Sequence, residues 1–166
     1  MEIPDDSVRR DVALAGPEAT AALAETLAKA ARPGDVIALR GDLGAGKTAF
    51  ARAFIRAREV MSGGAGATEV PSPTFTLVQT YQMPIGDVWH FDLYRLDRSA
   101  DAYELGLDEA MAEGIVLIEW PERLGSLLPA DRLDLALRFG AGEDARVAAM
   151  IGFGERGRRL VEAVPA

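Results

Sequence analysis

Hydrophobic and polar positions in the first half of the chain follow helix and strand periods in turn. Residues 18–31 place apolar side chains on one face at helical spacing, which predicts a helix that ends before Pro33 and Gly34. The apolar run 35–40 is typical of a short buried strand. Residues 47–58 follow the helical period again, so the pattern predicts a helix, a strand, a glycine-rich loop and a second helix.

The middle of the chain predicts further strands with one helix among them. Residues 74–81 and 88–96 have the pattern of strands, and residues 102–112 have that of a helix. The apolar run 114–119 predicts another buried strand, which ends before Pro121.

The C-terminal part has the pattern of a hairpin. Residues 133–139 alternate apolar and polar side chains, a glycine-rich turn follows at 140–142, and residues 146–151 return as a second strand. Strands that alternate with helices and are followed by a hairpin favour an α/β fold with a mixed sheet.

Composition is that of a soluble globular protein. Hydrophobic residues make up 49% of the chain and charged residues 27%. No apolar run approaches the ~18 residues that a membrane span needs. Residues 1–6 have neither the basic nor the apolar segment of a secretory signal. We therefore expect a cytoplasmic protein with no membrane partner.

Charge and residue usage exclude several kinds of site. The 18 basic and 26 acidic side chains give a formal net charge of −8, which argues against a protein that grips nucleic acid by its own basic surface. The chain has no cysteine and a single histidine, His90. Disulfides, cysteine nucleophiles and zinc sites are therefore excluded.

The segment 41–48, Gly-Asp-Leu-Gly-Ala-Gly-Lys-Thr, fits the phosphate-loop pattern G-x-x-x-x-G-K-[ST] in full. Its glycines let successive backbone N–H groups turn toward phosphate oxygens, and the following helix adds its positive N-terminal end. Lys47 is then expected to reach the β- and γ-phosphates and the Thr48 hydroxyl to bind Mg²⁺. The alternative, a glycine-rich turn without a ligand, fits less well because the motif lies between a predicted buried strand and a helix.

With this motif, the expected fold is a single P-loop NTPase-like domain over residues 1–166. It is a three-layer α/β sandwich with a mixed, mostly parallel sheet, helices on both faces and a C-terminal β-hairpin. The chain's 166 residues are enough for one domain and not for two.

ATP is favoured over GTP as the nucleotide. Guanine-specific P-loop proteins usually read the base with an Asn/Thr-Lys-x-Asp segment. This chain has no asparagine, and neither Lys29 nor Lys47 is followed by aspartate two residues later.

Two acidic residues are candidates for the metal and water chemistry, which needs a carboxylate at a strand end. Glu119 closes the strand 114–119, the position expected of a Walker B acid. Asp92 lies in the strand 88–96, where the period of two places it on one face with His90. For His90 itself, a structural role in the core is favoured.

Thr74 is a candidate switch residue. It follows residues 61–68, which contain three glycines and are expected to be flexible. In P-loop proteins, a loop that carries a threonine between the first helix and the next strand can sense the γ-phosphate and become ordered when the nucleotide binds. The same residues also fit an edge strand that begins at Pro73, and the sequence alone favours neither interpretation.

Five segments taken together resemble the TsaE (YjeE-like) family of bacterial P-loop ATPases. They are GDLGAGKT, SPTFTLV, HFDLYRL, the stretch 104–107 and IEWPE, in this order along the chain. The similarity extends from about residue 34 to residue 123, and more weakly to both termini. A phosphate loop alone is common to many families, whereas the five segments together are specific.

The resemblance implies a role in forming N6-threonylcarbamoyladenosine in tRNA, beside two partners, TsaB and TsaD. In that scheme the ATPase does not transfer the carbamoyl group, but uses ATP hydrolysis to keep the TsaB–TsaD complex turning over. The tRNA is then contacted only indirectly, through the complex, which agrees with the acidic charge of this chain.

The resemblance also implies roles for individual residues. The phosphate loop binds ATP, Thr48 and Glu119 contact Mg²⁺, Asp92 is the family's functionally important aspartate, and Thr74 is its switch-like threonine. Trp120 is expected to pack near the nucleotide, with Glu122 and Ala141 close to the base. The full set of expected nucleotide-binding residues is Gly41, Asp42, Leu43, Gly44, Ala45, Gly46, Lys47, Thr48, Trp120, Glu122 and Ala141. The stretch 63–67 is longer and richer in glycine than the usual family loop.

The expected chemistry is in-line attack of water on the γ-phosphoryl group, with Lys47 and Mg²⁺ stabilising the developing charge. Either Asp92 or Glu119 positions the water, and the sequence leaves this choice open. Two alternatives also remain: a small-molecule P-loop kinase, although no arginine-rich lid is visible, and a binding module in which ATP only orders a docking surface.

Overall fold

The computed structural model describes residues 4–166, which form a seven-stranded sheet with the strand order β1-β7-β6-β2-β5-β4-β3 and helices packed against it. Residues 1–3, the start of the segment in which no secretory signal is expected, lie outside the described residues. The strands are β1 (Val8–Leu14), β2 (Val36–Arg40), β3 (Val78–Tyr81), β4 (Val88–Asp92), β5 (Ile115–Glu119), β6 (Arg132–Phe139) and β7 (Arg146–Phe153). The α-helices are α1 (Pro17–Ala30), α2 (Lys47–Met61), α3 (Leu107–Glu113) and α4 (Gly154–Glu162), and the 3₁₀ helices are η1 (Ser99–Leu105) and η2 (Pro121–Leu127).

The centre of the sheet consists of the parallel strands β6, β2, β5 and β4. Antiparallel pairs complete both edges: β6 with β7, β7 with β1, and β4 with β3. In the parallel register Glu119 lies beside Leu39 on one side and beside Asp92 on the other. The carboxyl ends of β2, β4 and β5 therefore meet at one edge of the sheet, which is where open α/β sheets bind their ligands.

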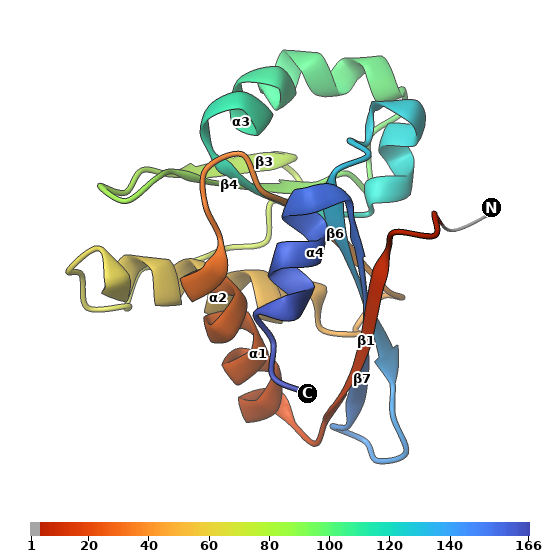
Figure 1. Cartoon of the computed structure of the whole chain (residues 1–166). Coiled ribbons are helices and arrows are strands. Elements are labelled where there is room, and N and C mark those ends of the chain that lie inside the picture. The colour runs from red at the N-terminus through yellow and green to blue at the C-terminus, as the bar shows by residue number, and fades with distance from the viewer. Residues whose placement is uncertain (1–3) are drawn as a thin grey trace.

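Helices cover both faces of the sheet and give three layers (Figure 1). On one face α1, α2 and α4 share an apolar core with the sheet, in which Phe50 and Phe54 are among the largest fully buried side chains. On the other face η1, α3 and η2 share a second core that includes Phe91 and Ile118. Figure 1 shows α1 and α2 below β3 and β4, and α3 above them. The expected α/β sandwich is confirmed, and the antiparallel pair β6–β7 is the predicted C-terminal hairpin.

The sequence pattern does not predict β1 or α4. β1 lies at the edge of the sheet and exposes charged side chains such as Arg9 and Asp11, so its apolar signal is weak. α4 contains Gly154 and Gly157, and glycine lowers helix propensity. A Cβ at Gly157 would overlap the backbone of Arg132, so the close packing of α4 on β6 needs glycine at this position.

Two predicted strands are shorter than the pattern indicates. The segment 74–81 is a strand only from Val78 onward, because the chain turns before it at Leu77, whose φ is 66°. The segment 88–96 ends as a strand at Asp92. The Asp92 carboxylate accepts a hydrogen bond from the backbone N–H of Tyr94 at 3.1 Å, and this local bond turns the chain out of the sheet.

Two helices also differ from prediction. The helix predicted for 102–112 is divided into η1 and α3 at Gly106, whose φ of 85° is left-handed. α2 continues to Met61, so the helix extends into the start of the stretch expected to be flexible.

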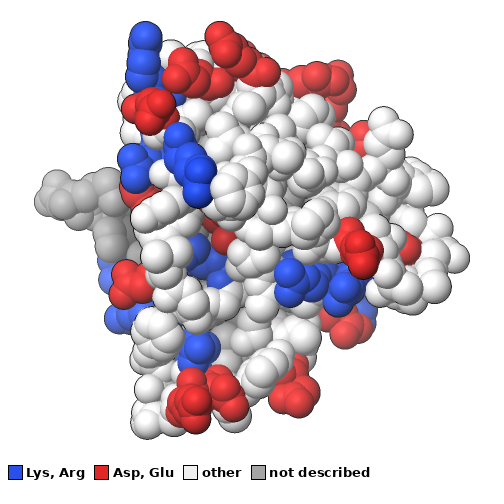
Figure 2. Space-filling view, turned by 180° about the vertical axis from the view of Figure 1, so that it is seen from behind, with Lys and Arg blue, Asp and Glu red and all other residues white. Residues whose placement is uncertain are grey.

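Charge is unevenly distributed over the surface. Figure 2 shows acidic side chains along the top of the molecule, where η1 and α3 lie. These two elements contain Asp101, Glu104, Asp108, Glu109 and Glu113. On the same face Lys and Arg are scattered among acidic and uncharged residues. Within residues 4–166, no helix combines the length and apolar character needed to cross a bilayer.

Candidate nucleotide-binding site

The loop 41–46 joins the end of β2 to the start of α2, as the phosphate-loop motif requires. Gly46 caps α2 with a φ of 113°, a left-handed conformation that other residues rarely adopt. At Gly41 an added Cβ would lie 2.6 Å from the carbonyl oxygen of Leu137, so a side chain here would push the loop away from β6. The glycines thus let the loop turn tightly over the N-terminus of a 15-residue helix, whose free N–H groups and dipole favour an anion.

Lys47 is buried at the first position of α2 and points back over the loop. Its ammonium donates hydrogen bonds to the carbonyl oxygens of Gly41 and Asp42, the latter at 3.0 Å, and lies 4.2 Å from the centre of the Trp120 ring. Burial lowers the pKa of Lys47, while the nearby carboxylates, Glu119 first among them, act in the opposite direction. The amino group of Lys47 therefore lies at the mouth of the loop, close to the carboxylates at the ends of β4 and β5.

Glu119 is held between two side chains at the end of β5. The Thr48 hydroxyl donates a hydrogen bond to Oε1 of Glu119 at 2.9 Å, and Nε2 of His90 lies 2.6 Å from Oε2. Only 2% of Glu119 is exposed. The structure thus brings together the two expected Mg²⁺ contacts, Thr48 and Glu119, although they are far apart in the sequence.

Asp92 and Thr74 form a second hydrogen-bonded pair across the same hollow. The Thr74 hydroxyl donates to Oδ2 of Asp92 at 3.0 Å, and the Ser72 hydroxyl lies 2.7 Å from that of Thr74. Thr74 lies in the turn before β3 and not in a strand. Of the two interpretations of this segment, the loop is the one that the structure shows.

A cavity of about 230 Å³ lies between these groups. It is lined by Leu43, Gly44, Gly46, Lys47, Thr48, Ala49, Ser72, Thr74, Asp92, Glu119 and Trp120. Most of the sequence-predicted site residues therefore converge on one hollow at the carboxyl edge of the sheet. Ser72 and Ala49 also line it and were not among the predicted residues; Ala49 directly follows Thr48, and Ser72 lies two residues before Thr74.

Trp120, Glu122 and Ala141 have different positions. Trp120 lines the cavity, and its ring lies 5.0 Å from that of Tyr94. Glu122 is exposed and lies 3.6 Å from Arg40 in an ion pair. Ala141 is exposed in the turn between β6 and β7. Neither Glu122 nor Ala141 lines this cavity.

A second hollow of about 240 Å³ lies on the other side of the loop. It is lined by Pro17, Thr20, Ala21, Gly44, Ala45, Gly46, Ala49, Asp144 and Arg146. Arg146 of β7 donates hydrogen bonds to the carbonyl oxygens of Ala45 at 3.1 Å and Gly44 at 3.4 Å, so it holds the outer side of the loop. Sequence reasoning missed Arg146, because nothing local distinguishes it from the other arginines.

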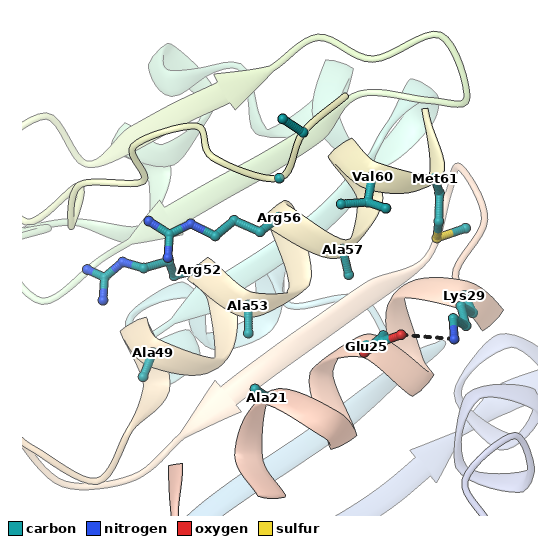
Figure 3. A pocket seen from close by; sticks show the side chains of 12 residues that line it. Ala21, Glu25, Lys29, Ala49, Arg52, Ala53, Arg56, Ala57, Val60 and Met61 are labelled. Carbon is teal, nitrogen blue, oxygen red and sulfur yellow. Dashed lines mark ion pairs between the residues drawn. The ribbon is translucent and has the colours of Figure 1, made fainter. Parts of the chain in front are cut away.

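A larger hollow, of about 490 Å³, lies elsewhere, between α1 and α2 (Figure 3). Figure 3 shows Ala49, Ala53 and Ala57 of α2 above Ala21 and Glu25 of α1. Apart from Ala49 it shares no residue with the phosphate-loop cavity, and it brings none of the predicted catalytic residues together. Although this hollow is larger than the phosphate-loop cavity, its residues do not indicate a catalytic site.

Comparisons with known proteins agree with this arrangement. The family model described as Threonylcarbamoyl adenosine biosynthesis protein TsaE matches residues 14–147, a range that contains the loop and both carboxylates. The tRNA threonylcarbamoyladenosine biosynthesis protein TsaE of Bacillus subtilis is 38% identical over 148 residues, which cover 88% of this chain and 87% of the relative. The protein of the same name from Aquifex aeolicus is 41% identical over 114 residues, 69% of this chain and 78% of the relative.

The fold is similar as well. The crystal structure of Bacillus subtilis YdiB matches with a TM-score of 0.77 at 32% sequence identity, over 96% of this chain and 95% of that one. The agreement in sequence, fold and extent shows that this chain belongs to the TsaE family.

Proposed function

We propose that this chain binds Mg²⁺-ATP in the phosphate-loop cavity and hydrolyses it as a component of N6-threonylcarbamoyladenosine formation in tRNA. Membership of the TsaE family and the names of the relatives support the pathway. One observation supports the ATPase activity. A single cavity at the N-terminus of α2 is lined by Lys47, Thr48, Thr74, Asp92 and Glu119.

The residues at the cavity fit Mg²⁺. The Thr48 hydroxyl and the Glu119 carboxylate offer two oxygen ligands whose atoms lie 2.9 Å apart. Residues 4–166 contain no cluster of three or more histidine, cysteine or acidic side chains arranged for a metal. The pair of oxygen ligands suits Mg²⁺, which is usually held by one or two protein oxygens, substrate phosphates and water. Bound Mg²⁺ would neutralise charge that develops on the phosphate oxygens.

The loop and Lys47 would hold the phosphates. Backbone N–H groups at the start of α2 favour anionic oxygens. The ammonium of Lys47 now contacts two loop carbonyls, and it would exchange them for the β- and γ-phosphate oxygens. ATP is the proposed nucleotide because the chain lacks the guanine-reading segment.

We propose that Asp92, and not Glu119, positions the attacking water. Glu119 is bonded to Thr48 through one oxygen and to His90 through the other, which places it among the proposed metal contacts. Asp92 is 4% exposed and is held at the cavity wall by Thr74 and the backbone of Tyr94. A carboxylate fixed in this way can accept a proton from water in line with the γ-phosphate. Because the Thr74 hydroxyl donates to Asp92, a γ-phosphate that binds this hydroxyl would remove the bond to Asp92. Binding of the γ-phosphate would then change how Asp92 holds the attacking water.

The proposed partners are TsaB-like and TsaD-like proteins, with tRNA contacted only through the complex. The net charge of −8 supports an indirect contact with tRNA.

Reconstitution with purified TsaB-like and TsaD-like proteins tests this function. We expect the chain to release phosphate from ATP and to be required for repeated cycles of tRNA modification, and we expect Lys47→Ala to lose both activities. A phosphorylated metabolite in place of free phosphate would indicate a kinase. Undiminished modification with a non-hydrolysable ATP analogue would indicate a binding module. Full activity of Lys47→Ala would contradict the proposal.

A further inference from the structure

His90 is a buried histidine in the middle of β4, and its side chain contacts Glu119 of the proposed metal site from inside the sheet. It is fully buried, and its backbone pairs with Leu117 on β5. From there the ring reaches Oε2 of Glu119, two residues further along β5, at 2.6 Å. This distance lies just below the range of about 2.7–2.9 Å for N–H donors to charged acceptors, so the two groups are in direct hydrogen-bond contact.

Within residues 4–166, the imidazole makes one hydrogen bond, to Glu119. An ionised carboxylate only accepts hydrogen bonds, so beside ionised Glu119 the protonated ring nitrogen is Nε2, which donates to Oε2. The other ring nitrogen, Nδ1, is buried and has no hydrogen-bond partner among the residues that the structure describes. Leaving a buried ring nitrogen unpaired is unfavourable, and an apolar side chain of similar size would avoid that cost. The chemical contribution of His90 is therefore its bond to Glu119.

Glu119 is thereby fixed at both oxygens. Thr48 holds Oε1 from the side of the cavity, and His90 holds Oε2 from inside the sheet. We propose that His90 is a positioning residue that orients the Glu119 carboxylate, so that Oε1 stays beside Thr48 and ready for the metal. This inference rests on the proposed function, because it concerns the same Mg²⁺-nucleotide site. Partners that orient a metal ligand in this way typically change metal affinity about 10–100-fold when they are removed.

The test measures metal affinity without turnover. Mn²⁺, which replaces Mg²⁺ as the probe, is titrated by electron paramagnetic resonance into the complex of the protein with a non-hydrolysable ATP analogue. His90→Leu keeps the size and removes the donor, whereas His90→Gln keeps an N–H group that can reach Oε2. We expect His90→Leu to weaken Mn²⁺ binding about 10–100-fold and His90→Gln to recover most of the loss.

Two controls separate positioning from general damage. In EDTA, without metal, the analogue is expected to bind wild type and His90→Leu with similar affinity. In a Glu119→Gln background, His90→Leu is expected to cause little further loss of Mn²⁺ affinity, because the two residues act through one carboxylate. If His90→Leu does not fold, His90→Asn replaces it, since its shorter amide does not reach Oε2, and the same loss is expected relative to His90→Gln.

Wild-type Mn²⁺ affinity in the donor-free variant would overturn the inference. So would an equal loss in His90→Gln, a parallel loss of metal-free analogue binding, or full additivity with Glu119→Gln. These results would leave the proposed function intact as long as wild type binds the Mn²⁺-analogue pair. Failure of wild type to bind the analogue would instead overturn the proposed function, and this inference with it.

Discussion

Replacing Thr48 by valine removes one hydroxyl and keeps the size and branching of the side chain. That hydroxyl donates to Oε1 of Glu119 at 2.9 Å, and the acceptor is a carboxylate of which only 2% is exposed. A hydrogen bond to a charged group contributes about 1.5–3 kcal/mol. We therefore expect the free energy of unfolding of the nucleotide-free protein to fall by about 1.5–3 kcal/mol in Thr48→Val. Thr48→Ser retains the hydroxyl and is expected to lose much less.

The same variant tests the metal role when nucleotide is present. A ligand at 100 times its dissociation constant stabilises the native state by about 2.7 kcal/mol. Urea unfolding followed by circular dichroism, with Mg²⁺-ATP and without it, measures this increment in wild type, Thr48→Ser and Thr48→Val. We expect most of the increment to disappear in Thr48→Val and to persist in Thr48→Ser. A Thr48→Val protein with unchanged stability and the full increment would refute both roles of the hydroxyl.

Three further predictions follow from other contacts. Asp92→Asn is expected to bind Mg²⁺-ATP nearly as wild type does but to release phosphate about 10²–10⁴-fold more slowly, since it removes the proposed proton acceptor; undiminished phosphate release would assign the water elsewhere. Asp35 is fully buried and lies 3.0 Å from Arg156 and 2.6 Å from Arg159, both of which keep some exposure to water. Asp35→Asn should therefore lower the free energy of unfolding by about 1.5–3 kcal/mol in urea titrations, the range for hydrogen bonds to charged groups, whereas Glu25→Gln at an exposed pair should change it little. Burial lowers the pKa of Lys47 from 10.5, so the unfolded state binds more protons than the native state between the lowered pKa and 10.5, and Lys47 adds a rise in stability with pH in that window; Lys47→Met should lack this rise, and identical pH profiles of the two proteins would contradict it.

More of the candidate site than of the elements at the edges of the sheet could be predicted from the sequence. The phosphate loop is contiguous in the chain, and its residue types follow from the backbone shape that phosphate needs, so Lys47 and Thr48 could be assigned directly. Glu119 closes a strongly apolar segment, and the end of such a buried strand can be recognised without knowing the sheet order. The pattern predicts Asp92 inside the strand 88–96, and only the structure shows that the strand ends at this residue. The register that places Glu119 and Asp92 side by side could not be read from the sequence.

Features that depend on tertiary contacts were not predictable. The bond between His90 and Glu119 requires the parallel pairing of β4 with β5, which no local pattern specifies. The alternating pattern around Thr74 predicts a strand and gives no sign of the turn at Leu77, where the backbone is left-handed. α4 contains two glycines that lower its propensity, and one of them is required by contact with Arg132 in another element.

Calorimetric titration of Mg²⁺-ATP into the purified chain tests the central claim most directly. The account predicts binding of one nucleotide per chain by wild type and by Lys29→Ala, whose lysine is exposed in a surface ion pair away from the loop. It predicts that Lys47→Ala loses most of this affinity. Absence of binding by folded wild-type protein, or equal binding by Lys47→Ala, would contradict it.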